Sequence, residues 1–225
     1  VSLQVQGFKK IGIIGMSGSG KTSLINLLSG FLTPDQAQIE LQGQKTTTMN
    51  IPAWQRQMTY IPQEPYVFTK SLRENIAFYN PQASDDEIKQ AIHIMGLDAL
   101  LNDLPNELDT VIGRGKRVLS GGQSQRIALA RAFLDPKRKI MIFDEPTAHL
   151  DIETEIDLKK RMMPLMQNKL VFFATHRLHW LKEMDYILVM DHGQLVEQGS
   201  YEQLQKNQGY FCKLMAGMRG ENNDQ

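Results

Sequence analysis

Apolar runs of strand length alternate with helical patterns in both outer parts of the chain. KKIGIIG, KIMIFDE, KLVFFATH and YILVMD are typical of buried strands in a parallel sheet. AQIELQGQ alternates between apolar and polar positions, which predicts a half-exposed strand. A helix is predicted after the first run and is stopped by Pro34. Its apolar face consists of residues at helical spacing: Leu24, Leu27, Leu28 and Phe31.

The middle of the chain, about residues 71–134, has helical periodicity instead. SDDEIKQAIHIMGL predicts a helix with Ser84 as its N-cap, acidic residues in its first turn and Gly96 near its end. SQRIALARAFL predicts a second helix that ends before Pro136. The chain is therefore predicted to be an α/β protein with a helical subdomain inserted in the core. Residues 217–225, GMRGENNDQ, have no apolar pattern and predict a disordered polar tail.

Composition narrows the class of protein further. The 225 residues include 25 basic and 25 acidic side chains, so no net positive charge favours nucleic acid as a partner. The single cysteine, Cys212, excludes an internal disulfide framework and fits a reducing compartment. No apolar run approaches the roughly 20 residues of a membrane helix. We expect a soluble, cytoplasmic domain that is a part of a longer polypeptide, because Val1 stands inside an apparent strand.

A phosphate-binding loop follows the first predicted strand. Gly15 to Thr22, GMSGSGKT, fits the pattern G-x-x-x-x-G-K-[ST] between a strand and a helix. The glycines let successive main-chain N–H groups converge on a phosphate, and the lysine adds a point charge for the β- and γ-oxygens. The predicted nucleotide-binding residues here are Gly15, Ser17, Gly18, Ser19, Gly20, Lys21, Thr22 and Ser23.

Two acidic residues end the predicted strand KIMIFDE, where ligands bind in parallel sheets. Asp144 is predicted to hold Mg²⁺ together with the Thr22 hydroxyl, and Glu145 to act as a general base on water. A phosphate loop by itself leaves a GTPase, a kinase, a helicase and a transport ATPase open. The absence of a guanine-specific N-K-x-D run weighs against the first of these.

Five motifs occur in an order that resembles the nucleotide-binding domain of ABC transporters. They are GMSGSGKT, YIPQEP, LSGGQ, IMIFDEPTAHLD and ATHR. The resemblance extends over nearly the whole chain. It implies a P-loop NTPase core sheet with an antiparallel β part and an inserted helical subdomain, spanning 1–216. The implied substrate and ion are ATP and Mg²⁺, and the implied activity is ATP hydrolysis coupled to transport.

The resemblance also assigns roles to residues outside the phosphate loop. Gln63 would bind Mg²⁺ and orient water, and His176 would contact the γ-phosphate and support Glu145. In this family two ATPase domains meet head to tail, and the signature of one faces the ATP of the other. The signature residues here are Ser120, Gly121, Gly122 and Gln123. Asp151 would pair across that dimer interface.

YIPQEPYVFTKSLRENI resembles the exporter type of this family. Tyr66, Val67 and Phe68 then form the landing site of a membrane domain, or alternatively pack between lobes. The motifs as a whole look most like half-transporters of the bacterial thiol-reductant exporter, which carries cysteine or glutathione and supports cytochrome bd assembly. This resemblance implies an N-terminal membrane domain outside this chain and a second ATPase domain as partner, a heterodimer being favoured. It places the domain at the cytoplasmic face of the cell membrane.

The sequence departs from the family pattern in two loops. The loop after Glu145 usually reads Ser-Ala-Leu-Asp, whereas here Ala148 to Asp151 reads Ala-His-Leu-Asp. Exporters often carry Gly-Glu before the signature, where this chain has Gly113-Arg114. Two other functions remain open at this point. One is a soluble ABC ATPase acting on nucleic acid or ribosomes, and the other is a non-hydrolysing module that associates when ATP binds.

Overall fold

The computed structural model describes residues 1–41 and 43–221, which form two compact units. The first unit comprises Val1–Tyr60, Lys139–Glu145 and the part of the chain from Asn168 onward. The second comprises Ile61–Arg138 and Pro146–Gln167. Within the described residues, no helix combines the length and the apolar character needed to cross a bilayer.

A six-stranded sheet with the order β4-β5-β6-β1-β7-β8 is built mainly from buried apolar strands. β6 pairs in parallel with β5 and β1, β1 pairs in parallel with β7, and β7 pairs antiparallel with β8. The strands are β1 Lys10–Ile14, β4 Met58–Ile61, β5 Ile140–Asp144, β6 Leu170–Ala174, β7 Tyr186–Asp191 and β8 Gln194–Gly199. β2 Ile39–Leu41 and β3 Gln44–Thr46 form a separate antiparallel pair. The predicted α/β core with an antiparallel part is confirmed.

The helices of the first unit are α1 Lys21–Leu28, α2 Pro52–Gln55, α8 Leu178–Leu181, α9 Tyr201–Asn207 and α10 Tyr210–Glu221. The predicted extension of the first helix to Phe31 is wrong. α1 ends at Leu28 because Gly30 adopts a left-handed φ of 73°, a conformation that terminates helices. Phe31 therefore leaves the helix face and lies exposed, with its ring 5.0 Å from that of Tyr60.

The prediction of a disordered tail from residue 217 is wrong for its first five residues, because α10 continues through Glu221. Leu214, Met215 and Met218 are buried along one face of this helix. The apolar face of α10 therefore extends past residue 216. The sequence from Gly217 onward contains too few apolar residues to show helical periodicity by itself. Residues 222–225 lie outside the described part of the chain.

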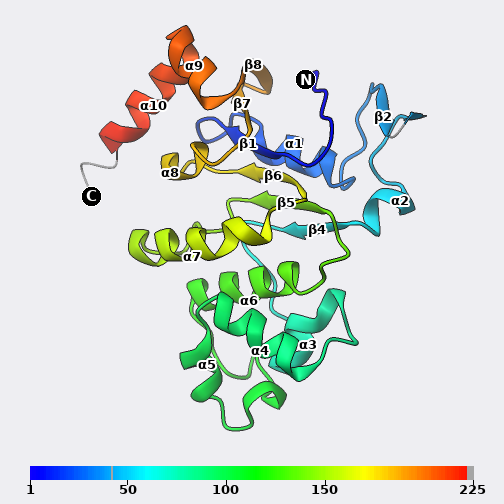
Figure 1. Ribbon diagram of the computed structural model, residues 1–225, viewed down its shortest axis with the longest axis vertical. Helices are drawn as coiled ribbons and strands as arrows, with labels where there is room; N and C mark the ends of the chain where they lie inside the picture. The colour runs from blue at the N-terminus through cyan, green and yellow to red at the C-terminus, as the bar shows by residue number, and fades with distance from the viewer. Residues whose placement is uncertain (42, 222–225) are drawn as a thin grey trace. The chain divides into compact units, whose positions relative to one another are not determined.

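The second unit is helical, and Figure 1 shows α3, α4, α5 and α6 gathered together within it. Its helices are α3 Leu72–Ile76, η1 Ala77–Tyr79, α4 Asp85–Ile94, α5 Asp98–Asn102, η2 Glu107–Asp109, α6 Gly121–Phe133 and α7 Ile152–Leu165. Ser84 caps α4 in a capping box with Glu87, as its position in the sequence predicts. The unit is larger than the predicted 71–134, since it also includes 61–70, 135–138 and 146–167.

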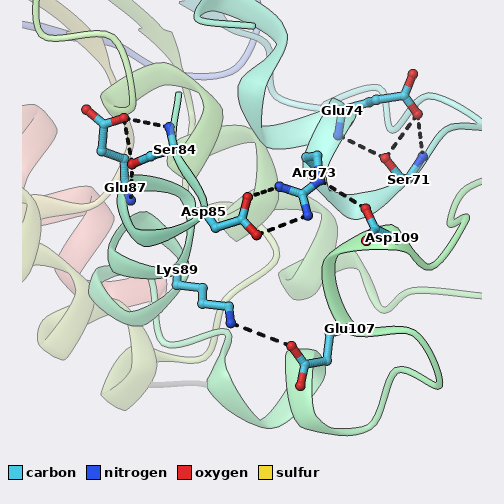
Figure 2. Close-up of polar contacts among 9 residues, drawn as sticks. All are labelled: Ser71, Arg73, Glu74, Ser84, Asp85, Glu87, Lys89, Glu107 and Asp109. Atoms are coloured by element: carbon cyan, nitrogen blue, oxygen red, sulfur yellow. Dashed lines mark hydrogen bonds and ion pairs between the residues drawn. The ribbon is translucent and has the colours of Figure 1, made fainter. Parts of the chain in front are cut away.

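Polar contacts tie three of these helices together at the surface (Figure 2). The Arg73 guanidinium on α3 bonds the Asp85 carboxylate at the start of α4 and the Asp109 carboxylate at the end of η2. Lys89 pairs with Glu107 at 3.6 Å on the same face. Both carboxylates raise the pKa of Arg73 above its ordinary value through hydrogen bonds.

Candidate active site

Three strand ends meet at one edge of the sheet in the first unit. The parallel register pairs Ala174 with both Ile13 and Asp144. Because the strands run in the same direction, the residues that follow them also lie at the same edge. These are the phosphate loop after β1, Glu145 after β5 and His176 after β6. The topology thus brings together predicted site residues that are separated by more than a hundred positions in the sequence.

The backbone of the phosphate loop requires glycine at two positions. A Cβ on Gly15 would lie 2.3 Å from Ser19 Oγ and 2.4 Å from the Met190 carbonyl oxygen, so no side chain fits. Gly20, the N-cap of α1, has a φ of 97°, which L-residues rarely adopt. The Gly193 N–H donates to the Ser19 carbonyl at 2.9 Å and braces the loop from the β7–β8 turn.

Lys21 is folded back over this loop. Its Nζ donates to the carbonyls of Gly15 at 2.9 Å and Met16 at 3.1 Å. Nζ also lies 3.9 Å from Glu145 Oε1. The ammonium is buried, and burial lowers its pKa against the opposing charges of Glu145 and Asp144. Carbonyl oxygens accept hydrogen bonds from the buried ammonium but do not neutralise its charge. An anion such as a phosphate group would supply the missing negative charge.

Asp144, the last residue of β5, is buried, and burial raises the pKa of its carboxyl. A hydrogen bond with the Thr22 side chain and the Lys21 charge lower the pKa, while the charge of Glu145 raises it. Asp144 Oδ1 has no hydrogen-bond partner among the described residues. The Ser19 hydroxyl oxygen is buried and without such a partner as well.

Glu145 and His176 form a pair beside Lys21. His176 Nδ1 lies 3.1 Å from Glu145 Oε2. This hydrogen bond is the main cause that lowers the Glu145 pKa, against burial, which raises it. The charges of His176, Lys21 and Arg177 lower it further. Glu145 has a φ of 49°, an uncommon conformation for a non-glycine residue, and such strain often occurs at functional positions.

In the second unit the signature forms the start of α6. Ser120 is the N-cap, and its hydroxyl accepts from the Gln123 N–H at 3.1 Å. The Gln123 side chain in turn accepts from the Ser120 N–H at 2.9 Å, which completes a capping box. The side chain of Gln123 is therefore engaged in holding the helix start. The helix N-terminus carries partial positive charge, which suits an anion.

Gln63 and Asp151 belong to two other loops of this unit. Asp151 is the N-cap of α7, and hydrogen bonds from Thr154 lower the pKa of its carboxyl. The Gln63 carbonyl accepts a bond from Gln125, a residue that the sequence reasoning missed. The signal for Gln125 was present in the sequence, because it shares the helical spacing of the buried Ala128, Leu129 and Ala132. A polar residue in an apolar stripe must find partners.

The first-unit residues fit Mg·ATP on the geometry described above. A glycine-dependent cradle, a buried lysine and two unpartnered buried oxygens are features that a polyphosphate and a cation satisfy. The described residues contain no group of three His, Cys, Asp or Glu side chains suited to a metal. Mg²⁺ does not require one, since it is commonly held by one or two protein oxygens with phosphate and water.

Comparison with known protein families finds one that matches more than half of the chain. Residues 1–148 match the family model described as ABC transporter. The glutathione/L-cysteine transport system ATP-binding/permease protein CydC of Bacillus subtilis (strain 168) is 49% identical over 221 residues. That match covers 98% of this chain and 39% of the relative. The protein of the same name from Escherichia coli (strain K12) is 34% identical, over 97% of this chain and 38% of the relative.

A solved structure has the same fold. A bacterial Atm1-family ABC exporter with ATP bound superimposes with a TM-score of 0.84 at 32% sequence identity. The match covers 96% of this chain and 38% of that chain. The present chain thus spans under half the length of each of these relatives.

Proposed function

The chain belongs to the ABC transporter family, as an ATPase domain, and on this premise we propose that it hydrolyses ATP to drive an exporter. The observation that carries the proposal is the convergence of Lys21, Glu145 and His176 at one edge of the sheet. Glu145 Oε1 lies 3.9 Å from Lys21 Nζ and Oε2 lies 3.1 Å from His176 Nδ1. A cation for phosphate and an ionised base for water are the two groups that hydrolysis needs.

In this proposal different residues bind the phosphates, activate the attacking water and hold Mg²⁺. Main-chain N–H groups of Gly15 to Ser23 and the Lys21 ammonium bind the phosphates. Glu145 takes the proton of the attacking water, and His176 orients the Glu145 carboxylate and contacts the γ-phosphate. Thr22 and Asp144 would hold Mg²⁺, together with Gln63, to which the family pattern assigns the same role. The bound ion would neutralise charge on the β- and γ-phosphates.

The signature supports a second element of the proposal, a head-to-tail dimer. Ser120, Gly121, Gly122 and Gln123 of one domain would face the ATP bound by another. Each domain then completes its partner's site. This arrangement explains why one chain contains both a phosphate loop and a signature that faces phosphate. We propose a heterodimer with a related ATPase domain, with Asp151 at the interface.

The relatives suggest what the exporter carries. CydC of Bacillus subtilis is described as a glutathione/L-cysteine transport protein, and it combines an ATP-binding part with a permease part. We propose that the present domain works with a membrane-spanning domain of the same polypeptide at the cytoplasmic face of the membrane. The proposed cargo is cysteine or glutathione, in support of cytochrome bd assembly.

The test combines phosphate release with size measurement. We expect the chain to release phosphate from Mg·ATP, and Glu145→Gln to lower kcat by about 10²-fold or more because the base is lost. Glu145→Gln mixed with a related ATPase domain and Mg·ATP should elute as a dimer of the two chains in size-exclusion chromatography with light scattering. Glu202→Gln on α9 is the control and should match the wild type. Dimers without phosphate release by the wild type would instead indicate an association module and contradict the proposal.

A further inference from the structure

One buried side chain in the second unit bonds two separate loops. Gln125 lies on α6, five residues after the N-cap Ser120, and is 0% exposed. Its Nε2 donates to the Gln63 carbonyl at 3.3 Å, and its Oε1 accepts from the His149 main-chain N–H at 3.0 Å. Both ends of the amide are thus used, each with a main-chain partner.

The loop that contains His149 also packs directly on the first turn of α6. A Cβ built on Gly121 would lie 3.3 Å from His149 Cβ. A Cβ built on Gly122 would lie 3.0 Å from Leu150 Cδ2. A side chain at Gly121 would require His149 to shift by a few tenths of an ångström, and one at Gly122 would require the same of the Leu150 side chain. The glycines therefore serve the approach of this loop, in addition to leaving the helix start open.

The same loop is anchored at its other side. Leu150 is buried, and its N–H donates to the Thr147 carbonyl at 3.1 Å. The Thr147 hydroxyl donates to the buried Glu155 carboxylate on α7. The loop thus has fixed ends on α7, and its middle is held to α6 by the Gln125 amide. Movement of His149 away from α6 breaks the bond to Oε1.

We propose that Gln125 is a positioning residue that holds the Gln63 loop and the 147–150 loop to the signature helix, so that one amide sets both loops for hydrolysis. The inference rests on the proposed function, in which Gln63 acts at the ATP of its own chain and the signature at the ATP of the partner. A single side chain then links the geometry of the two sites. Because both partners are main-chain groups, the link does not depend on the side chain at position 149.

The test replaces the amide by an apolar side chain of similar length. Gln125→Met removes two part-buried hydrogen bonds, the one to the Gln63 carbonyl and the one from the His149 N–H, a loss that corresponds to about tenfold in a rate. We expect kcat to fall about tenfold while KM for ATP stays within about twofold, because the phosphate loop belongs to the other unit. Gln205→Met on α9 removes the same amide group and its bond to the Tyr201 hydroxyl, and serves as the matched control.

Amide hydrogen exchange gives a readout that does not depend on activity. In Gln125→Met the His149 amide should exchange about tenfold faster, while the strands of the core sheet exchange as in the wild type. Gln125→Glu keeps an acceptor for the His149 N–H but replaces the donor to Gln63. It should lower kcat with His149 still protected, and it serves as the test variant if Gln125→Met does not fold.

The outcomes separate the inference from the proposed function. Phosphate release by the wild type together with unchanged kcat and unchanged exchange in Gln125→Met would overturn the inference alone. An equal loss of kcat in Gln125→Met and Gln205→Met would also overturn it, since the effect would then be general. No phosphate release by the wild type would overturn the proposed function and the inference together.

Discussion

His176 Nδ1 lies 3.1 Å from Glu145 Oε2, and the histidine side chain is 46% exposed whereas the glutamate is 15% exposed. This exposed histidine holds the pKa of a mostly buried carboxyl below its ordinary value, in opposition to burial. A base is useful only when ionised, so the pair extends the pH range in which Glu145 can take a proton.

Removal of the histidine should therefore shift the pH profile of hydrolysis. In His176→Ala the largest cause that lowers the Glu145 pKa is lost, and burial raises the pKa instead. We expect the acid limb of the kcat profile to move to higher pH and kcat at pH 7 to fall about 10²-fold. Steady-state phosphate release between pH 5 and pH 9 measures both. His93→Ala, which removes a similar pair with Asp98 on the second unit, is the control. An unshifted acid limb would contradict the role of the pair.

Asp144 should reduce the stability of the nucleotide-free protein, because burial raises the pKa of its carboxyl. A raised pKa means that the ionised form is disfavoured by folding, so the cost is present above the ordinary Asp pKa and disappears below it. Asp144→Asn should raise the melting temperature at pH 7 by about 2–4 °C, equivalent to roughly 1 kcal/mol. The gain should vanish near pH 3.

Calorimetry of the nucleotide-free protein at both pH values measures this effect. The exposed Asp103→Asn is the control and should leave the melting temperature unchanged. Mg·ATP should stabilise Asp144→Asn less than the wild type, because Asp144 is a proposed ligand of Mg²⁺. A lower melting temperature for Asp144→Asn at pH 7 would show that the carboxylate is well stabilised in the folded state.

The close approach at Gly15 makes a steric prediction. A methyl group there meets Ser19 Oγ at 2.3 Å and the Met190 carbonyl oxygen at 2.4 Å, so Gly15→Ala requires the loop to shift. We expect a loss of about 1–3 kcal/mol in the free energy of unfolding and a loss of ATP binding. Gly217→Ala on α10, where a Cβ meets nothing within 4 Å, should instead be stabilising by up to about 1 kcal/mol. Denaturant titration of both variants checks the contrast.

The Arg73 contacts in Figure 2 predict a small, salt-dependent effect. Arg73→Ala breaks the bonds to both Asp85 and Asp109. Because these carboxylates are exposed, we expect the melting temperature to fall by no more than about 4 °C at low salt and by less at 1 M salt. Lys89→Ala, which breaks a single exposed pair with Glu107, should have a smaller effect. A loss that is independent of salt would mean that Arg73 contributes by packing.

The sequence by itself determined the parts of this protein whose chemistry is local. The phosphate loop, the strand that ends at Asp144, and the cap Ser84 depend on residues within a few positions of one another. Neighbouring side chains and main-chain groups suffice to produce a glycine turn, an apolar strand or a capping box. These features could therefore be predicted without knowing what packs against them.

Only the tertiary structure decided the contacts between segments that are distant in sequence. The bonds of Gln125 reach across 62 residues to Gln63 and 24 residues to His149. A side chain fixes its own donors and acceptors, but the fold determines which main-chain groups lie within reach of them. The sequence therefore specified the chemical groups of the site, and packing decided which of them are held together.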